Sequence, residues 1–148
     1  MKLALFNGSP RYKKSNSKIL LEHFLKGYNR INPEQVPVHY LARYKEEETY
    51  RIAFQQADAV LIIFPLYTDS MPGIVKQFFE SLVASEIQPG KKIGFIVQSG
   101  FPEAVHSIYV ERYLKKLTQR LKGEYLGTVI KGGVEGIQIM PPWMTKKL

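Results

Sequence analysis

The segment 7–17 gathers side chains that suit a bound anion. It reads Asn-Gly-Ser-Pro-Arg-Tyr-Lys-Lys-Ser-Asn-Ser, so several hydroxyl donors surround one arginine. A guanidinium can hold a phosphate through two parallel hydrogen bonds, and Gly8 would let the backbone come close to the ligand. A helix is expected to start at the end of this segment, and its free N-terminal amides favour an anion there. We therefore predict a phosphate site built from Ser9, Arg11, Ser15 and Ser17.

The segment lacks the motifs of several known phosphate-binding loops. The dinucleotide motif G-x-G-x-x-G and the P-loop motif G-x-x-x-x-G-K-[ST] are both absent. No acidic residue ends the first or third predicted strand, which leaves a phospho-acceptor domain without its acceptor. Ser15 or Asn16 alone is best explained as a helix cap, and Arg11 alone as a surface residue. Their occurrence together in one loop favours the anion site.

A later loop, 65–72, could hold a flat ring system. It is longer than a minimal connection between a strand and a helix, and it contains an aromatic ring, a thioether and several polar groups. Backbone amides of the loop could meet the polar edge of a ring that lies on Leu66, Tyr67 and Met71. We interpret Asp69 and Ser70 as caps of the following helix, with Pro72 at its first position.

The loop 99–103 is the third candidate. Gly100 permits a close approach of the backbone, Phe101 could form a wall beside a ring, and Ser99 offers a hydroxyl donor. His106 follows in the next predicted helix, where a lone histidine is interpreted as a surface or capping residue. Ser99 and Phe101 are therefore the candidate residues of this loop.

The elements that must position these loops follow from hydrophobic periodicity. The pattern predicts strands at 2–6, 36–40, 59–64, 92–98 and 125–131, and helices at 16–29, 46–57, 73–84 and 103–121. Two of the strands are apolar on both faces, as expected for buried parallel strands. This alternation predicts an α/β fold, a doubly wound parallel sheet with helices on both faces. Ligands bind such sheets at the carboxyl ends of the strands, where all three loops lie.

Composition places the chain among ordinary globular proteins. It has 148 residues, of which 45% are hydrophobic and 23% charged, and a net charge of +8. This length predicts one domain spanning residues 1–148. The absence of cysteine excludes disulfides, zinc ribbons and cysteine nucleophiles, and the three histidines lack the spacing of a metal site. No apolar run reaches the ~18 residues of a membrane span, so we expect no membrane partner and a cytoplasmic location.

Two groups of motifs can be compared with known proteins. The first is Gly8-Ser9-Pro10-Arg11 followed by Ser15-Asn16-Ser17, with Tyr12, Lys13 and Lys14 between them. The second is Pro65-Leu66-Tyr67, then Met71-Pro72-Gly73 and Lys76-Gln77-Phe78-Phe79-Glu80. Together they are fairly specific, and the chain resembles the flavodoxin-like NAD(P)H-dependent FMN reductases and quinone reductases along nearly its whole length.

The resemblance implies a five-stranded sheet in the order 2-1-3-4-5 with FMN at the switch point. It implies that the FMN phosphate is held by Ser9, Arg11, Ser15, Asn16 and Ser17. It also implies that the isoalloxazine ring is flanked by Pro65, Leu66, Tyr67, Thr68 and Met71, with Ser99, Gly100 and Phe101 on its far edge. Hydride would pass from NADH or NADPH through the flavin to a small acceptor such as a quinone, a nitro compound or free flavin. The flavin carries this chemistry, so no catalytic side chain is expected.

A doubly wound sheet of this order needs a fifth helix after its last strand. Only 17 residues follow Lys131, and Pro141-Pro142 interrupts them. A bare sheet face would forgo roughly 1.5–3 kcal/mol for each exposed core side chain. We therefore expect a fold that lacks a complete last helix. Either the chain is truncated within about 131–148, or a partner, such as a second copy in a homodimer, covers that face.

Two other functions remain as alternatives. A flavodoxin-type electron carrier would share the fold, although such carriers are usually acidic and this chain has a net charge of +8. A non-catalytic basic module that binds nucleic acid or another polyanion would account for the charge. The basic residues are dispersed, however, and no run of five occurs. We therefore expect a small-molecule partner and no nucleic acid.

Overall fold

The computed structural model describes residues 1–43, 46–84, 87–102, 107–139, 141 and 143. Its strands are β1 (Leu3–Asn7), β2 (Val38–Tyr40), β3 (Ala59–Pro65), β4 (Lys92–Gln98) and β5 (Glu124–Lys131). Its helices are α1 (Asn16–Tyr28), α2 (Glu47–Gln56), α3 (Gly73–Val83) and α4 (Ile108–Arg120). All neighbouring strands are parallel, in the order β2-β1-β3-β4-β5. The predicted doubly wound sheet is confirmed.

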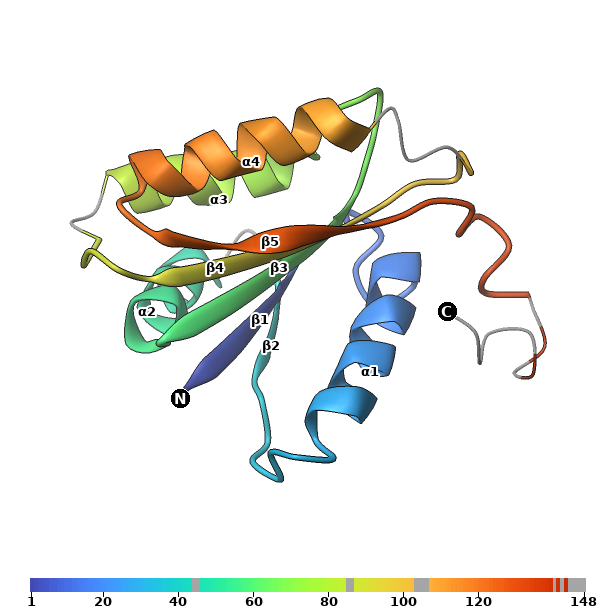
Figure 1. The fold of residues 1–148 in the computed structure, drawn as a ribbon, viewed down its shortest axis with the longest axis horizontal. Helices are drawn as coiled ribbons and strands as arrows, with labels where there is room; N and C mark the ends of the chain where they lie inside the picture. Colours follow the sequence, from blue (N-terminus) through green and yellow to red (C-terminus); the bar gives the residue numbers. More distant parts are fainter. Residues whose placement is uncertain (44–45, 85–86, 103–106, 140, 142, 144–148) are drawn as a thin grey trace.

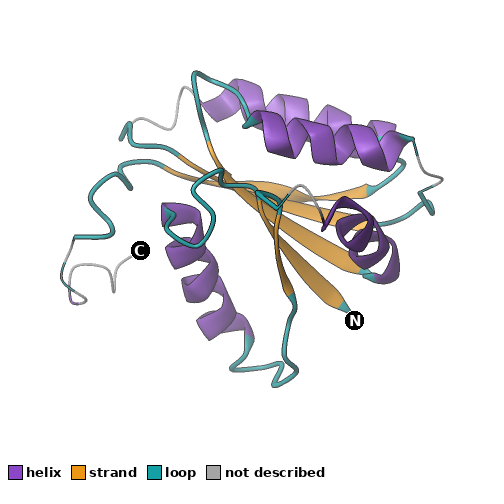
Figure 2. Ribbon diagram, turned by 180° about the vertical axis from the view of Figure 1, so that it is seen from behind, coloured by secondary structure: helices purple, strands orange, loops and turns teal. Residues whose placement is uncertain are grey.

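The two faces of the sheet are covered unequally. Figures 1 and 2 show α3 and α4 side by side over one face, with α1 on the opposite face. Phe54 of α2 and Phe78 of α3 lie in the larger core cluster, together with Leu114 of α4. The smaller cluster on the other face joins Leu20 and Leu21 of α1 to inward side chains of the sheet. Within the described ranges, one face therefore has three helices, and α1 is the single helix that packs on the other.

The register of the sheet brings the three candidate loops to one edge. Asn7, the last residue of β1, pairs with Ile63 of β3, and Pro65 at the end of β3 pairs with Gln98 at the end of β4. Since the strands are parallel, the loops that follow them all leave from the same edge. The chain then turns from β1 to α1 on one face and from β3 to α3 on the other, which opens a crevice between the two loops.

Observed boundaries mostly differ from the predicted ones by one or two residues. The predicted strand 36–40 is shortened to β2, because β1 pairs only with Val38 to Tyr40 of this segment. The predicted helix 103–121 is observed as α4 from Ile108 onward. Residues 103–106, including His106, lie outside the described residues, so the interpretation of that histidine is left as a prediction.

The segment after β5 takes the place of the last helix that the fold would need. Residues 132–134 have no regular structure and residues 135–139 form turns, and the segment runs past the N-terminal end of α1 (Figure 1). Val134 and Ile137 are buried in the same cluster as α1. These turns therefore cover only the part of the sheet nearest to α1. In the described part of the chain, no helix is both long and apolar enough to cross a membrane.

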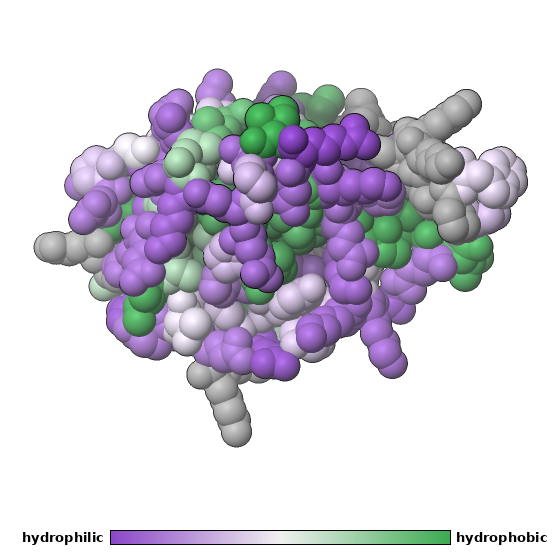
Figure 3. Space-filling model, turned by 90° about the horizontal axis from the view of Figure 1, so that it is seen from below, coloured by the Kyte–Doolittle hydropathy of each residue, from purple (hydrophilic) through white to green (hydrophobic). Residues whose placement is uncertain are grey.

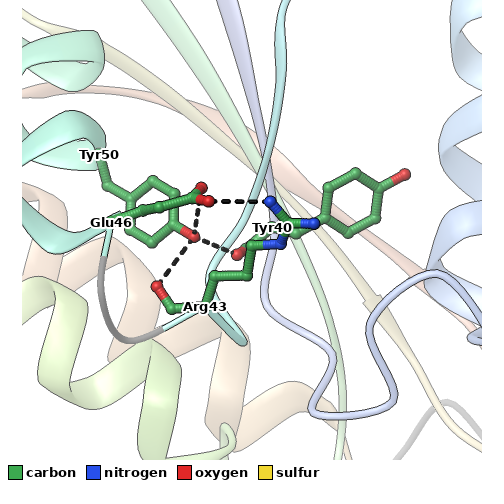
Figure 4. A network of polar contacts seen from close by, with 4 residues as sticks. All are labelled: Tyr40, Arg43, Glu46 and Tyr50. Carbon is green, nitrogen blue, oxygen red and sulfur yellow. Dashed lines mark hydrogen bonds and ion pairs between the residues drawn. The ribbon is translucent and has the colours of Figure 1, made fainter.

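A buried tyrosine ties α2 to the end of β2 (Figure 4). The hydroxyl of Tyr50 donates to the carbonyl oxygen of Tyr40 and lies 3.2 Å from that of Arg43 and 3.3 Å from Oε2 of Glu46. Glu46 also accepts from Arg43 at 2.9 Å. Burial, helped by the nearby Glu46 carboxylate, raises the pKa of Tyr50 to about 12. The folded protein therefore retains the phenol proton at pH values where an unfolded chain would lose it.

Replacing Tyr50 with phenylalanine should remove an alkaline loss of stability. An unfolded tyrosine ionises near pH 10, so wild-type stability should fall between pH 10 and the folded pKa of about 12. Over this window the free energy of unfolding of wild type should drop by up to roughly 2–3 kcal/mol more than that of Tyr50→Phe. Urea unfolding from pH 8 to pH 11.5 measures this difference. In the control variant Tyr109→Phe, which changes an exposed tyrosine, the free energy of unfolding should depend on pH as it does in wild type. If the free energy of unfolding of Tyr50→Phe fell with pH as steeply as that of wild type, Tyr50 would not be the source of the alkaline loss.

Candidate functional site

A pocket of about 300 Å³ opens where β1, β3 and β4 end. It is lined by Ser9, Arg11, Asn16, Pro65, Leu66, Tyr67, Gln98, Ser99, Gly100, Phe101 and Glu135. All three predicted loops contribute to it, so the structure brings together residues that are far apart in the sequence. The predicted residues Ser15, Ser17, Thr68 and Met71 do not line it. Gln98 and Glu135 line it without having been predicted.

One end of the pocket is rich in hydrogen-bond donors. The hydroxyl of Ser9 accepts from the amide of Arg11 at 3.3 Å, which leaves its own proton for a ligand. In the described part of the chain, the guanidinium of Arg11 forms no ion pair, and the amides of Asn16 and Ser17 at the start of α1 have no partner. A positive charge and free amides at a helix N-terminus favour an anion. This end therefore suits a phosphate.

Asn7 and Gly8 give the first loop its shape. The side chain of Asn7 is buried, and its Oδ1 accepts from the amide of Ser9 at 2.9 Å. A methyl group on Gly8 would lie 2.3 Å from Cγ2 of Val75 in α3, a distance that no side chain tolerates. Gly8 is therefore required by the packing of α3 against this loop. The expectation that Gly8 also lets the backbone approach a ligand stays a prediction.

Tyr12 anchors the middle of the same loop. Its ring lies edge-on to that of Tyr40, with centroids 4.9 Å apart, and the guanidinium of Arg43 lies 5.1 Å from its centroid. Tyr12 also has a positive φ of 53°, which an L-residue adopts only when its surroundings hold it there. These contacts connect the loop to the Tyr50 network at the end of β2. They position Arg11, the preceding residue, at the pocket.

Ser15 and Ser17 have structural partners. Ser15 is the N-cap of α1: its hydroxyl accepts from the amide of Lys18 at 3.2 Å and donates to the carbonyl of Tyr12 at 2.8 Å. Ser17 is fully buried, and its hydroxyl lies 3.5 Å from Nε2 of Gln98. The hydroxyl of Ser15 is therefore used within the protein, whereas Ser17 is buried and does not line the pocket with its side chain, so it offers its backbone amide at the donor-rich end.

The opposite end of the pocket is more apolar. Leu66, Tyr67 and Phe101 form its walls, and Phe101 is 69% exposed. The amide of Leu66 donates to the carbonyl of Gln98 at 2.7 Å, which ties the loop after β3 to the end of β4. Apolar and aromatic side chains of this kind offer a surface on which a planar ring can stack.

A tight turn shapes the loop after β3. Tyr67 and Ser70 exchange two backbone hydrogen bonds of 2.9 and 3.1 Å, and both residues between them have positive φ, 48° for Thr68 and 61° for Asp69. This is the geometry of a type I′ turn. Pro72, not Asp69 or Ser70, is the N-cap of α3, so the predicted capping role of these two residues is wrong. A β-branched residue in the left-handed region is strained.

Relief of that strain should stabilise the protein. The double variant Thr68→Asn, Asp69→Gly places the preferred residues of a type I′ turn at both positions. We expect the free energy of unfolding to rise by about 1 kcal/mol and the melting temperature by about 2–4 °C. Thermal unfolding measures the shift. The control is Thr49→Asn on the exposed side of α2, which exchanges the same residue types outside a turn and should leave the melting temperature nearly unchanged. An unchanged melting temperature for the double variant would show that the turn at Thr68 and Asp69 is not strained.

Met71 belongs to a different cavity. It faces a cavity of about 400 Å³ between the loop after β3 and α4, lined by Asp69, Ser70, Met71, Lys76, Tyr109, Val110 and Tyr113. Its side chain also packs against the larger core cluster. Met71 therefore packs behind the loop after β3 and does not line the pocket that Leu66 and Tyr67 line.

Glu135 is the residue that sequence reasoning missed most clearly. The predicted pattern ended at the fifth strand, and no periodic element in the following Gly-rich segment indicated a return to the pocket. The signal available was Gly132-Gly133, because Gly133 has a φ of 69° and a methyl group on Gly132 would lie 2.5 Å from the carbonyl oxygen of Phe101. Adjacent glycines that permit such a turn and such a contact marked a segment that folds back on the loop after β4.

The sequence and the fold can be compared with those of known proteins. A family model described as "Flavodoxin-like fold" matches residues 1–139. No curated protein matches the sequence. The solved structures that it resembles include an NADPH-quinone reductase from P. pentosaceus, at 18% identity and a TM-score of 0.74 over 99% of this chain and 92% of that one.

Two further structures show the same likeness. One is an NADH:FMN oxidoreductase in its apo form, at 14% identity and a TM-score of 0.75, with 98% of this chain and 82% of that one covered. The other is an FMN-dependent NADH-azoreductase from Bacillus anthracis in complex with FMN, at 16% identity and a TM-score of 0.71, with 99% and 93% covered. Such identities establish a common fold. Because the family model covers nearly the whole sequence, the chain belongs to the Flavodoxin_2 family of flavodoxin-like folds.

Proposed function

We propose that this protein is an FMN-dependent oxidoreductase that passes hydride from NADH or NADPH to a small acceptor. A quinone, a nitro compound or free flavin would be a suitable acceptor. One observation carries the proposal: a single pocket joins free donors at one end, Ser9 and Arg11, to apolar and aromatic walls at the other, Leu66, Tyr67 and Phe101. The fold relatives described as FMN-dependent or NAD(P)H-dependent reductases support it.

The lining of the pocket matches the two ends of FMN. A phosphate monoester carries nearly two negative charges, which the guanidinium of Arg11 and the free amides at the start of α1 can receive. The walls formed by Leu66 and Tyr67 offer a surface for an aromatic ring system. The residues present therefore match both ends of the ligand.

When bound, FMN would supply the hydride chemistry, so the protein needs no nucleophile. The side chains of this pocket bind and orient. Ser9 and Arg11 hold the charged end, and the loop 65–72 holds the ring end through a turn whose backbone geometry is fixed by two hydrogen bonds. The open side beyond Tyr67 and Phe101, both exposed, leaves room for a nicotinamide or an acceptor to stack. Because NAD(P)H is the reductant, we place the reaction in the cytoplasm.

Flavin binding and turnover test the proposal directly. Purified protein, titrated with FMN, should quench flavin fluorescence, and it should oxidise NADH or NADPH in the presence of FMN and a quinone. Absence of both signals would overturn the proposed function. FMN binding without NAD(P)H oxidation would favour the flavodoxin-type carrier, and a salt-dependent shift of DNA without flavin affinity would favour the basic polyanion-binding module.

We also propose that a second copy covers the exposed part of the sheet. Leu126 and Val129 on β5 are 54% and 62% exposed. Val129 pairs with Ile96, a member of the cluster on the α1 face, and a methyl group on Gly94 would meet both Cβ of Leu126 and Leu61, which packs on that cluster. Leu126 and Val129 therefore lie on the side that α1 leaves open. Figure 3, which views the molecule from this side, shows hydrophobic groups between the hydrophilic ones. β5 is an edge strand, and an edge strand can pair with its own copy across a two-fold axis.

Replacing Val129 with lysine should then shift the protein from twice 17.0 kDa toward 17.0 kDa in light scattering. A charge at this position would be buried without a partner at a two-fold interface. Val83→Lys, on the other side of the molecule at 67% exposure, should leave the mass unchanged. A wild-type mass of 17.0 kDa at all concentrations would contradict the homodimer.

A further inference from the structure

The segment after β5 brings a carboxylate into the pocket. Glu135 lines it together with Ser9 and Arg11. A methyl group on Gly100 would lie 3.3 Å from Oε2 of Glu135, so the carboxylate lies directly over the backbone of the loop after β4. In the part of the chain that the structure describes, this carboxylate makes no hydrogen bond and no ion pair. Its lone pairs are therefore available to a ligand.

The position of this segment is fixed on two sides. The amide of Val134 donates to the carbonyl of Ser99 at 3.1 Å, and the amide of Gly133 donates to that of Phe101 at 2.9 Å. From α1, Nδ2 of Asn16 donates to the carbonyl of Val134 at 2.8 Å. Val134 is also buried against α1. Glu135 is thus held at the pocket by contacts with both the loop after β4 and the start of α1.

A second unmatched acceptor lies on the same side of the pocket. Asn16 also lines the pocket, and its Oδ1 is buried without a hydrogen-bond partner among the described residues. A buried acceptor without a partner costs free energy, so it favours a ligand that donates. The carboxylate of Glu135 can only accept when ionised, and it repels a phosphate. This side therefore suits a neutral group that carries several hydroxyl donors.

We propose that Glu135, with Oδ1 of Asn16 beside it, binds the hydroxyl groups of the polyol chain that joins the phosphate of FMN to its ring. The proposal rests on the proposed function and adds the residue that recognises the middle of the ligand. Donors at Arg11 meet the phosphate, apolar walls meet the ring, and acceptors at Glu135 meet the hydroxyls between them. The opposite charges of Arg11 and Glu135 also orient the ligand, because only one direction places the phosphate beside the arginine.

Three flavins separate the contributions of the three parts of the ligand. FMN has the phosphate and the polyol, riboflavin has only the polyol, and lumiflavin has neither. Dissociation constants come from quenching of flavin fluorescence by the wild-type protein and by Glu135→Ala and Glu135→Gln. Glu135→Ala should weaken FMN and riboflavin alike by about tenfold, the equivalent of about 1.4 kcal/mol of hydrogen bonding, and leave lumiflavin within about twofold. Glu135→Gln, which keeps an acceptor oxygen, should show a smaller loss in the same pattern.

Glu124→Ala is the matched control, since Glu124 is an exposed acid at the start of β5, the strand that ends before the segment with Glu135. It should bind all three flavins as wild type does, and the melting temperatures of all variants should agree. An equal loss for lumiflavin, a tighter binding of FMN alone, or no change in any affinity would each overturn the assignment of Glu135. If the wild-type protein binds none of the three flavins, the proposed function itself fails. If the wild-type protein binds flavins and the Glu135 variants bind them equally well, only the assignment of Glu135 fails.

Discussion

Replacing Arg11 with alanine should weaken FMN binding by about 10- to 100-fold while riboflavin binding stays within about twofold. Hydrogen bonds to a charged group contribute about 1.5–3 kcal/mol, and only FMN presents a phosphate to the guanidinium. Arg11 forms no ion pair among the described residues, so its removal leaves no carboxylate without a partner. Fluorescence titration with the two flavins measures the ratio of the dissociation constants.

The salt dependence of binding gives a second measure. Salt screens the attraction between a guanidinium and a phosphate, so FMN affinity should fall with ionic strength for the wild-type protein and fall less for Arg11→Ala. Arg30→Ala, an exposed arginine in the turn after α1, is the control and should behave as wild type. An equal loss of FMN and riboflavin in Arg11→Ala would show that the arginine does not contact the phosphate.

Replacing Gly8 with alanine should destabilise the protein by about 1–3 kcal/mol or more. The added methyl group would lie 2.3 Å from Cγ2 of Val75 and 3.2 Å from Cβ of Phe64, both of which are fully buried. Neither side chain can move into open space, so α3 or the first loop must shift. Urea unfolding should show a lower midpoint, and FMN affinity should fall with it because the loop carries Ser9 and Arg11.

A double-mutant cycle identifies the cause of this loss. Val75→Ala alone should cost about 2 kcal/mol, because it leaves a cavity in the core. Combined with Gly8→Ala, it makes room for the new methyl group, so the double variant should be more stable than the sum of the two losses by about 1 kcal/mol or more. Gly27→Ala in α1 meets nothing within 4 Å and should stabilise the protein. Strict additivity at Gly8 and Val75 would contradict the steric explanation.

Local patterns were sufficient for the order of the elements and for most of the pocket. β3 and β4 are apolar on both faces, which only a central parallel strand requires, and their positions matched the predictions closely. Parallel strands place their carboxyl ends at one edge, so the loops containing Arg11, Tyr67 and Phe101 could be expected to converge. These inferences depend on residue type and spacing along the chain, which the sequence contains in full.

Contacts between distant segments were beyond such reasoning. Nothing around Ser15 shows that its hydroxyl caps α1 instead of facing a ligand, and nothing around Gly8 reveals the methyl group of Val75, 67 positions away. Met71 carries the thioether that a ring could use, yet the turn at Thr68 and Asp69 directs the loop so that Met71 faces another cavity. Each outcome depends on how two elements pack, which periodicity does not describe.

By itself, the sequence determined that this chain forms a doubly wound parallel sheet and that hydroxyl and guanidinium donors gather in the loop after its first strand. Only the tertiary structure decided which donors of that loop remain free and that Glu135 joins them from beyond the last strand. The physical reason is the range of the interactions. Strand and helix formation follow from neighbours along the chain, whereas the composition of a pocket follows from side chains that meet only after the sheet has assembled.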